Sequence, residues 1–194
     1  MLQPAAAWLA RGGIVAYPTD TFYGLAADPA SAEALRRLFD LKGRAPDVAT
    51  PLIASSREQV EQAFGALAGP SARLAAAFWP GPLSLVLDAP SWMTPAVHGG
   101  RGTAAVRVPD HAVARALADA FGHPVTATSA NRSGERPAAE AAALAWRDAD
   151  PRVFVIDAGS TPGGAPSTIV DARGDVPVCV RAGAIAWDRV LTSQ

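Results

Sequence analysis

The sequence has little of the material that builds disulfides, membrane spans or export signals. Its single cysteine, Cys179, excludes an internal disulfide. No stretch approaches the roughly 18 uninterrupted apolar residues that a membrane-spanning helix needs, because proline, glycine, aspartate or arginine interrupts each run. The opening MLQPAAAWLARGG has neither the basic start nor the apolar length of a signal peptide. We therefore expect a cytoplasmic protein without a membrane segment.

Net charge is also nearly absent. The 17 lysines and arginines are balanced by 18 aspartates and glutamates, which leaves a formal charge of −1. This balance gives no global attraction to nucleic acid, so RNA binding would need a local basic face. The composition therefore weakens an RNA-binding interpretation.

Several signatures of catalytic sites are missing as well. The sequence contains neither a G-x-x-x-x-G-K-[ST] loop nor a G-x-G-x-x-G motif. His98, His111 and His123 have no metal-like spacing to one another or to Cys179, and no Ser-His-acid set stands out. Cys179 lies in an apolar strand candidate, where a buried, inert thiol is favoured over a nucleophile. Zinc and covalent-nucleophile chemistry are thus disfavoured.

What the sequence does have is an alternation of short apolar runs with Ala/Leu-rich segments, over a length that fits one domain. Strands are predicted at 13–17, 51–55, 83–87, 104–108, 124–128, 153–157, 167–171 and 176–182. Helices are predicted at 4–11, 31–41, 57–67, 71–78, 111–121 and 137–147. This pattern is typical of an α/β fold whose central sheet is covered by helices on part of both faces. The longest loop-like segment, 89–102, is a candidate lid.

Polar residues follow the predicted strands, which is where open α/β sheets bind ligands. In YPTDTFYG, Thr19, Asp20 and Thr21 either form a local Asx or ST turn or face a ligand. In LFDLKGR, Lys42 and Arg44 either complement the end of a helix dipole or reach an oligophosphate. Neither alternative is decided by these residues alone.

Further polar positions come later in the chain. Arg107 lies among apolar neighbours, where a charge is costly unless it is paired or bound to a ligand. TATSANRSG and GGAPSTIVD have the character of ordinary loops or of ligand-binding turns, and Gly163 and Gly164 would let backbone amides approach an anion.

Taken in order, seven motifs over residues 12–185 resemble the YrdC-like family, also called TsaC, the threonylcarbamoyl-AMP synthases. The motifs are GGIVAYPTDTFYGLAAD, LFDLKGR, FWPGPLSLVL, TAAVRVPDH, PVTATSANRSG, PSTIVD and VRAGAI. The resemblance implies a single domain over residues 1–194, built as a twisted mixed β-sheet with flanking helices around a large concave cavity. It corresponds to the short form of the family, without the additional C-terminal domain.

The resemblance also implies a reaction. L-threonine, bicarbonate and ATP would give threonylcarbamoyl-adenylate and pyrophosphate, with Mg²⁺ held mainly by the nucleotide phosphates rather than by protein ligands. Downstream proteins would then transfer the threonylcarbamoyl group to tRNA. No protein nucleophile is needed, because arginine, lysine and hydroxyl groups suffice to bring anionic reactants together and neutralise developing charge.

The family's functional positions are carried over motif by motif. Lys42 and Arg44 correspond to a catalytic basic pair that faces ATP. The threonine-side positions are Thr21, Arg107, Ala127 and Ser167, with Arg107 expected to hold the carboxylate. The remaining ATP-side positions are Thr103, Ser129, Asn131 and Arg181.

The sequence departs from the family at three points. Thr50 stands before Pro51 where an asparagine near ATP is usual, in a segment, 45–55, that is longer than usual. Ser55 or a neighbour replaces a histidine near threonine, and Ala182 replaces a common proline. The altered segment motivates one alternative, a non-catalytic RNA-binding or regulatory homologue. Another alternative is carbamoyl transfer to a different acceptor, as in fused relatives used for hydrogenase maturation.

Overall fold

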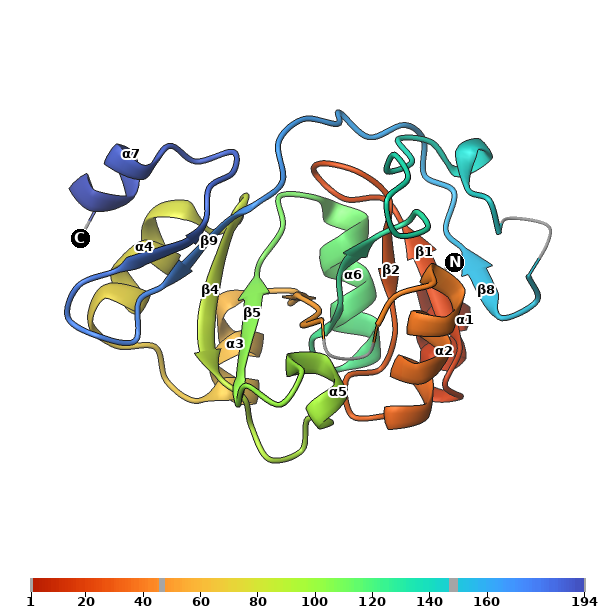
Figure 1. Cartoon of the computed structure of the whole chain (residues 1–194), viewed down its shortest axis with the longest axis horizontal. Helices are drawn as coiled ribbons and strands as arrows, with labels where there is room; N and C mark the ends of the chain where they lie inside the picture. Colours follow the sequence, from red (N-terminus) through yellow and green to blue (C-terminus); the bar gives the residue numbers. More distant parts are fainter. Residues whose placement is uncertain (1, 46–47, 147–149, 194) are drawn as a thin grey trace.

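A computed structural model describes residues 2–45, 48–146 and 150–193. Within these ranges the chain forms two mixed β-sheets with helices packed against them (Figure 1). The α/β class predicted from the sequence is confirmed, with the strands divided between two sheets instead of one.

The smaller sheet has four strands in the order β7-β2-β1-β8. They are β1 (Ile14–Tyr17), β2 (Gly24–Ala26), β7 (Thr128–Ser129) and β8 (Val153–Val155). β1 pairs antiparallel with β2 and parallel with β8, and all of its residues are buried. Successive side chains of a strand point to opposite faces, so this apolar strand contributes to a core on each side.

The larger sheet has six strands in the order β10-β9-β4-β5-β3-β6. They are β3 (Leu52–Ile53), β4 (Leu83–Asp88), β5 (Thr103–Arg107), β6 (Val125–Thr126), β9 (Thr168–Asp171) and β10 (Val178–Arg181). β4 is antiparallel to β5, with Asp88 opposite Thr103 and Leu85 opposite Val106. Arg107 and Thr103 therefore lie at opposite ends of β5, roughly 13 Å apart at about 3.3 Å per residue.

Helices form where the sequence supplies an apolar face, and serine side chains cap two of them, at Ser31 and Ser56. They are α1 (Leu2–Ala10), α2 (Ala32–Lys42), α3 (Arg57–Phe64), α4 (Gly69–Phe78), α5 (Pro95–His98), α6 (Ala112–Phe121) and α7 (Trp187–Thr192). The Ser31 hydroxyl caps α2 by accepting the Ala34 N–H at 3.1 Å. α2 ends at Gly43, whose φ of 60° suits a residue without Cβ. This cap leaves Lys42 in the last turn of α2 and Arg44 just beyond it.

Helices cover both faces of the smaller sheet. Val15 and Tyr17 pack in one cluster with α1 and α6, whereas Ile14 and Ala16 belong to a second cluster that includes Leu35 of α2. Burying side chains of this size stabilises the fold by about 1.5–3 kcal/mol each relative to leaving them exposed. The expectation of a sheet covered on both faces is confirmed here.

The helix predicted over 137–147 is wrong over its described part. Residues 137–140 form no helix, and only the short 3₁₀ turn Ala141–Ala143 follows, while residue 147 lies outside the described residues. The Ala138 carbonyl accepts the Tyr23 N–H at 2.9 Å, and the Ala139 carbonyl accepts the Thr161 N–H at 2.8 Å. Carbonyls bound to other segments are not free for helical hydrogen bonds, so tertiary pairing overrides the alanine propensity.

The expectation that Cys179 is buried is also wrong. Cys179 is exposed, as are the other residues of β10, the outer strand of the larger sheet. β10 pairs with β9 along one edge, and it is the end strand in the order of the sheet. The apolar run at this position therefore predicted a strand correctly, but not whether the strand is buried.

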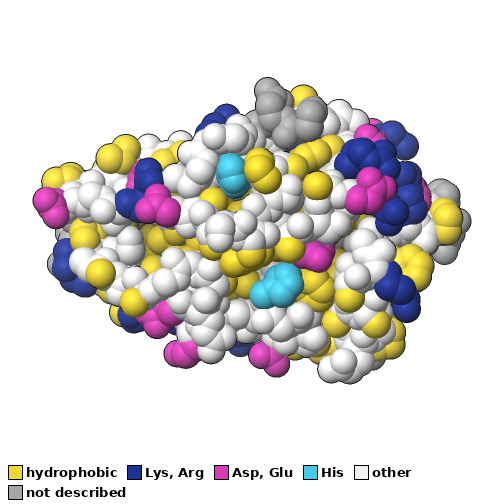
Figure 2. Space-filling view, turned by 90° about the horizontal axis from the view of Figure 1, so that it is seen from below, with side chains coloured by type: hydrophobic (Ala, Val, Ile, Leu, Met, Phe, Trp, Pro, Cys, Tyr) yellow, Lys and Arg dark blue, Asp and Glu magenta, His cyan; other side chains and the backbone are white. Residues whose placement is uncertain are grey.

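Charged side chains of both signs share the surface. On the face shown in Figure 2, lysine and arginine side chains lie beside acidic ones, and the middle of the face is largely apolar or uncharged. α2 illustrates the pattern, because Arg36 pairs with both Glu33 and Asp40. In the described part of the chain, none of the helices is long and apolar enough to span a bilayer.

Candidate functional site

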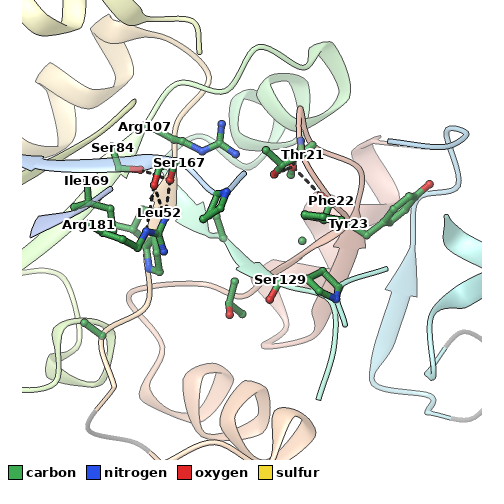
Figure 3. Close-up of a pocket in the computed structure, with 18 of the residues that line it drawn as sticks. Thr21, Phe22, Tyr23, Leu52, Ser84, Arg107, Ser129, Ser167, Ile169 and Arg181 are labelled. Atoms are coloured by element: carbon green, nitrogen blue, oxygen red, sulfur yellow. Dashed lines mark hydrogen bonds between the residues drawn. The ribbon is translucent and has the colours of Figure 1, made fainter. Parts of the chain in front are cut away.

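A cavity of about 480 Å³ lies between the two sheets (Figure 3). This volume falls in the range of about 300–1,000 Å³ that is usual for small-molecule sites. One side, here called the six-stranded wall, carries Ser84, Arg107, Ser167 and Arg181. The opposite side, the four-stranded wall, consists of the turn from Thr19 to Gly24, the strand residues Thr128 and Ser129, and Arg44 from the end of α2.

The turn after β1 has its own hydrogen-bond network. The Thr19 hydroxyl donates to the Phe22 carbonyl at 2.7 Å and accepts the Thr21 N–H at 3.2 Å. Its oxygen also lies 3.2 Å from that of the Thr21 hydroxyl. The local ST turn is therefore confirmed, and it places Thr19 and Thr21 on the cavity surface.

Arg107 ends β5 at the six-stranded wall and pairs with Asp20 from the turn after β1. Its Nη1 donates to both carboxylate oxygens at 2.7 Å. The two side chains are only 9% and 12% exposed, so water screens this pair weakly. Nη1 is the Arg107 atom that holds Asp20, which leaves the Nε and Nη2 edge for another acceptor. Asp20 was a candidate only through its turn, and its pairing with Arg107 was not predicted because nothing local links it to an arginine 87 positions away.

Arg181 and Ser167 are joined on the same wall. Arg181 Nη2 donates to the Ser167 carbonyl at 2.7 Å and to its hydroxyl at 3.0 Å, and the hydroxyl oxygens of Ser84 and Ser167 lie 3.0 Å apart. Close approach of the backbone past Gly183 permits this contact, since a Cβ there would clash with the Pro166 carbonyl. Burial, and secondarily the charge of Arg107, lower the pKa of Arg181.

Arg44 is the cation of the four-stranded wall. Its Nη1 donates to the Thr128 hydroxyl at 3.2 Å and its Nη2 to the Ala49 carbonyl at 2.8 Å. Burial lowers its pKa from the ordinary arginine value, but a guanidinium stays charged at neutral pH. Three guanidinium groups, those of Arg44, Arg107 and Arg181, thus border one cavity.

Lys42, the partner of Arg44 in the motif, does not line the cavity. Its Nζ donates to the Ser129 carbonyl at 2.5 Å and to the Asn131 carbonyl at 2.7 Å. Asn131 also lies outside the lining, with its Nδ2 donating to the carbonyls of Arg132 and Glu135 and its Oδ1 buried without a partner. The structure therefore brings Thr21, Arg44, Arg107, Ala127, Ser129, Ser167 and Arg181 together around the cavity.

Thr103 is separated from this set. It begins β5 at the end remote from Arg107, and it does not line the cavity, so we leave it out of the site. Segment 89–102 also stays away from the lining, because Met93 and Val97 are buried in the core and the Val97 carbonyl accepts the Thr50 N–H. The packing of this segment gives no support to a lid.

The substituted residues Thr50, Ser55 and Ala182 are not among the residues that line the cavity. Thr50 is buried and its hydroxyl has no hydrogen-bond partner among the residues that the structure describes, whereas its neighbours Ala49 and Pro51 do line the cavity. The Ser55 N–H donates to the side chain of Gln59. Part of the altered segment, residues 46 and 47, lies outside the described residues. The Thr50 hydroxyl therefore does not lie at the cavity surface, where the family resemblance leads us to expect an asparagine amide.

The long connection from β8 to β9 runs from the smaller sheet to the larger sheet (Figure 1). The Gly163 N–H donates to the Thr21 carbonyl at 2.7 Å, and the Tyr23 hydroxyl donates to the Gly159 carbonyl at 2.7 Å. This connection is thereby tied to the turn after β1, and it ends at Pro166 and Ser167 on the six-stranded wall.

The charged donors of the site suit anions better than metal ions. Among the described residues, no group of three or more histidine, cysteine, aspartate or glutamate side chains could hold a metal ion. The cavity-lining set offers guanidinium and hydroxyl groups, and guanidinium groups bind carboxylates and phosphates bidentately. The arrangement can therefore hold a carboxylate and a polyphosphate side by side.

Comparisons with known proteins identify relatives of this chain. The sequence model of the Sua5/YciO/YrdC family, described as "Telomere recombination", matches residues 7–183. A protein of Bacillus subtilis named threonylcarbamoyl-AMP synthase is 37% identical over 193 residues, covering 97% of this chain and 55% of that protein. A synthase of the same name from Thiobacillus denitrificans is 42% identical over 165 residues, covering 85% of this chain and 87% of that protein.

A solved structure is similar over nearly the whole chain. The crystal structure of Pyrococcus abyssi Sua5 in complex with L-threonine has a TM-score of 0.89 and 34% identity, covering 99% of this chain and 56% of that one. The chain thus spans about half the length of the B. subtilis and P. abyssi relatives. The sequence match and the shared fold show that this chain belongs to the Sua5/YciO/YrdC family.

Proposed function

We propose that this chain is a threonylcarbamoyl-AMP synthase, which joins L-threonine, bicarbonate and ATP into threonylcarbamoyl-AMP and pyrophosphate. The observation that carries the proposal is the cavity bordered by Arg44, Arg107 and Arg181 together with several hydroxyl groups. The names of the relatives and the threonine bound to P. abyssi Sua5 support it. The adenylate would pass to transfer proteins that modify tRNA.

Arg107 would hold the threonine carboxylate. Asp20 occupies its Nη1, so the Nε and Nη2 edge remains for two parallel hydrogen bonds to the carboxylate oxygens. Thr21, Ala127 and Ser167 border the same cavity and would surround the rest of the amino acid.

Arg44 and Arg181 would bind the triphosphate, with Ser129 as a neutral donor between the nucleotide and the four-stranded wall. Both arginines already bind neutral oxygen atoms of the protein rather than carboxylates. Exchanging a carbonyl for a phosphate oxygen replaces a neutral acceptor with an anionic one and so adds the attraction between opposite charges. Magnesium would enter with the nucleotide as part of the substrate, since the lining supplies no carboxylate set for it.

The chemistry needs alignment more than reactive side chains. The neutral threonine amine forms an N–C bond to the carbon of bicarbonate as water leaves, and the product is a carbamate. A carbamate oxygen then forms a bond to the α-phosphorus while the bond between that phosphorus and the β-bridging oxygen breaks, releasing pyrophosphate. Holding the two anions in contact supplies proximity, and the arginines stabilise the charge that develops on the phosphates.

Pyrophosphate release tests the proposal. The purified protein is given MgATP and bicarbonate with L-threonine, with L-serine, or without an amino acid. Threonine-dependent release supports the synthase, and release with serine alone would mean that the amino-acid specificity differs. No release from folded protein would contradict the proposal and favour an RNA-binding or regulatory homologue, an alternative that the formal net charge of −1 does not favour.

A further inference from the structure

Lys42 and Arg44 are two residues apart in one motif but face different surroundings. Arg44 borders the cavity, whereas Lys42 is only 3% exposed and lies behind the loop that begins at Ser129. Two of its three ammonium N–H groups are directed at backbone carbonyls, those of Ser129 and Asn131.

Backbone hydrogen bonds hold both ends of the 129–133 loop next to Lys42. The Ser133 N–H donates to the Lys42 carbonyl at 2.9 Å, so the backbone of Lys42 holds the far end of the loop. The Asn131 N–H donates to the Ser129 carbonyl at 3.0 Å, and the Ala130 N–H reaches the Tyr23 carbonyl at 2.7 Å. Of these residues, Ser129 and Tyr23 border the cavity.

We propose that Lys42 is a positioning residue that acts through the 129–133 loop: its ammonium group gathers the Ser129 and Asn131 carbonyls and thereby fixes Ser129 at the cavity surface. Lys42 itself does not touch the substrate. The structural part of this proposal stands on the contacts alone, and its kinetic part rests on the synthase function proposed above.

A lysine suits this role for electrostatic reasons. Two carbonyl oxygens that converge on one point repel each other unless a donor lies between them, and an ammonium group offers three N–H donors on a flexible stem. Burial, and then the charge of Arg44, lower the pKa of Lys42 to about 8. The group therefore remains mostly protonated at neutral pH despite its burial, with the two carbonyls as its hydrogen-bond partners.

Amide hydrogen exchange without substrates tests the structural part. Lys42→Met keeps the length of the side chain and removes its donors, and Arg44→Met is the matched control. We expect exchange of the amides in 129–134 to become roughly tenfold faster or more in Lys42→Met and to stay unchanged in Arg44→Met. Exchange in β4 reports whether each variant is folded. Unchanged exchange of the loop in folded Lys42→Met would overturn the proposal.

A second variant keeps the test decisive if Lys42→Met does not fold. Lys42→Gln retains a neutral N–H donor of shorter reach, and we expect its loop to exchange at a rate between those of the wild type and a loop without the clamp. A Lys42→Gln loop as protected as the wild type would equally contradict the requirement for the ammonium group.

A double-mutant cycle tests the kinetic part through threonine-dependent pyrophosphate release. Ser129→Ala should lower kcat/KM in the wild type and in Arg44→Met, yet cause little further loss in Lys42→Met, because the loop is already released. Two results would contradict the claim that Lys42 acts through Ser129. One is that Ser129→Ala lowers kcat/KM as much in Lys42→Met as in the wild type, and the other is that Ser129→Ala alone leaves kcat/KM at the wild-type value. If no variant turns over threonine, the proposed function fails while hydrogen exchange still decides the role of Lys42.

Discussion

The two walls of the cavity present positive charge differently. On the six-stranded wall, Arg107 and Arg181 both reach the cavity, one paired with a carboxylate and the other bound to the oxygens of Ser167. On the four-stranded wall, only one member of the basic pair in the LFDLKGR motif borders the cavity. Arg44 does so, and Lys42 is directed into the protein behind the loop.

This difference separates two uses of a cation. A guanidinium that binds only neutral oxygen atoms can exchange them for a substrate anion, and one with a free edge can bind the anion there. An ammonium that binds converging carbonyls is part of the scaffold, because its removal takes a hydrogen-bond donor away from each of them. The following substitutions test whether the walls differ in this way.

The largest effect is expected for Arg44→Met. It removes the cation of the four-stranded wall and should lower kcat by roughly 10²–10³-fold, as for other donors that stabilise developing charge. Arg36→Met is the matched control, an exposed arginine of α2 that pairs with Glu33 and Asp40. A kcat for Arg44→Met within about threefold of the control would remove Arg44 from the proposed phosphate site.

Arg107→Lys should act on threonine rather than on ATP. A single ammonium cannot keep Asp20 and also offer two parallel donors to a carboxylate, so we expect the threonine KM to rise by roughly 30–100-fold. The ATP KM measured in the same assay serves as the internal control. An equal rise in both constants would show that the six-stranded wall does not separate the two substrates.

The burial of Lys42 predicts how stability depends on pH. Its pKa is about 8 in the folded protein and near 10.5 in the unfolded chain, so the unfolded chain binds more protons between these values. The free energy of unfolding of the wild type, relative to Lys42→Met, should therefore rise from pH 8 to pH 10.5, by on the order of 2 kcal/mol. Urea unfolding of both proteins at several pH values measures the difference. If the difference in unfolding free energy between the two proteins does not change with pH, folding does not lower the pKa of Lys42.

The smallest effect is expected for Asp20→Asn. The variant keeps the shape of the side chain and weakens the hydrogen bonds that orient Arg107, so the threonine KM should rise by roughly five- to tenfold. Asp110→Asn is the control, because that carboxylate is largely exposed in its pair with Arg115. A threonine KM equal to that of the control would mean that Arg107 is oriented without Asp20.

Local signals in the sequence predicted much of the fold. The helix expected at 31–41 is observed at Ala32–Lys42, because a serine cap, an apolar face and a glycine end all act within one segment. β2 and α7 were not predicted, since both are short and gain their order from packing against other elements. The exposure of β10 was missed for a related reason: composition marks a strand, whereas burial depends on which elements cover it.

The sequence likewise predicted some features of the site and not others. The motifs indicated seven of the residues that line the cavity, including Arg44, Arg107, Ser167 and Arg181. The pairing of Asp20 with Arg107 and the inward direction of Lys42 could not be predicted, because each joins segments more than 80 residues apart. Only the assembled sheets show which polar groups satisfy one another.

The central claim is that this cavity joins threonine, bicarbonate and ATP in one product. The most direct measurement is mass spectrometry of the nucleotide formed from L-threonine, MgATP and ¹³C-bicarbonate. The account predicts a threonine-containing adenylate that is heavier by one mass unit than the product of unlabelled bicarbonate. An adenylate without the label, or no adenylate from folded protein, would contradict it.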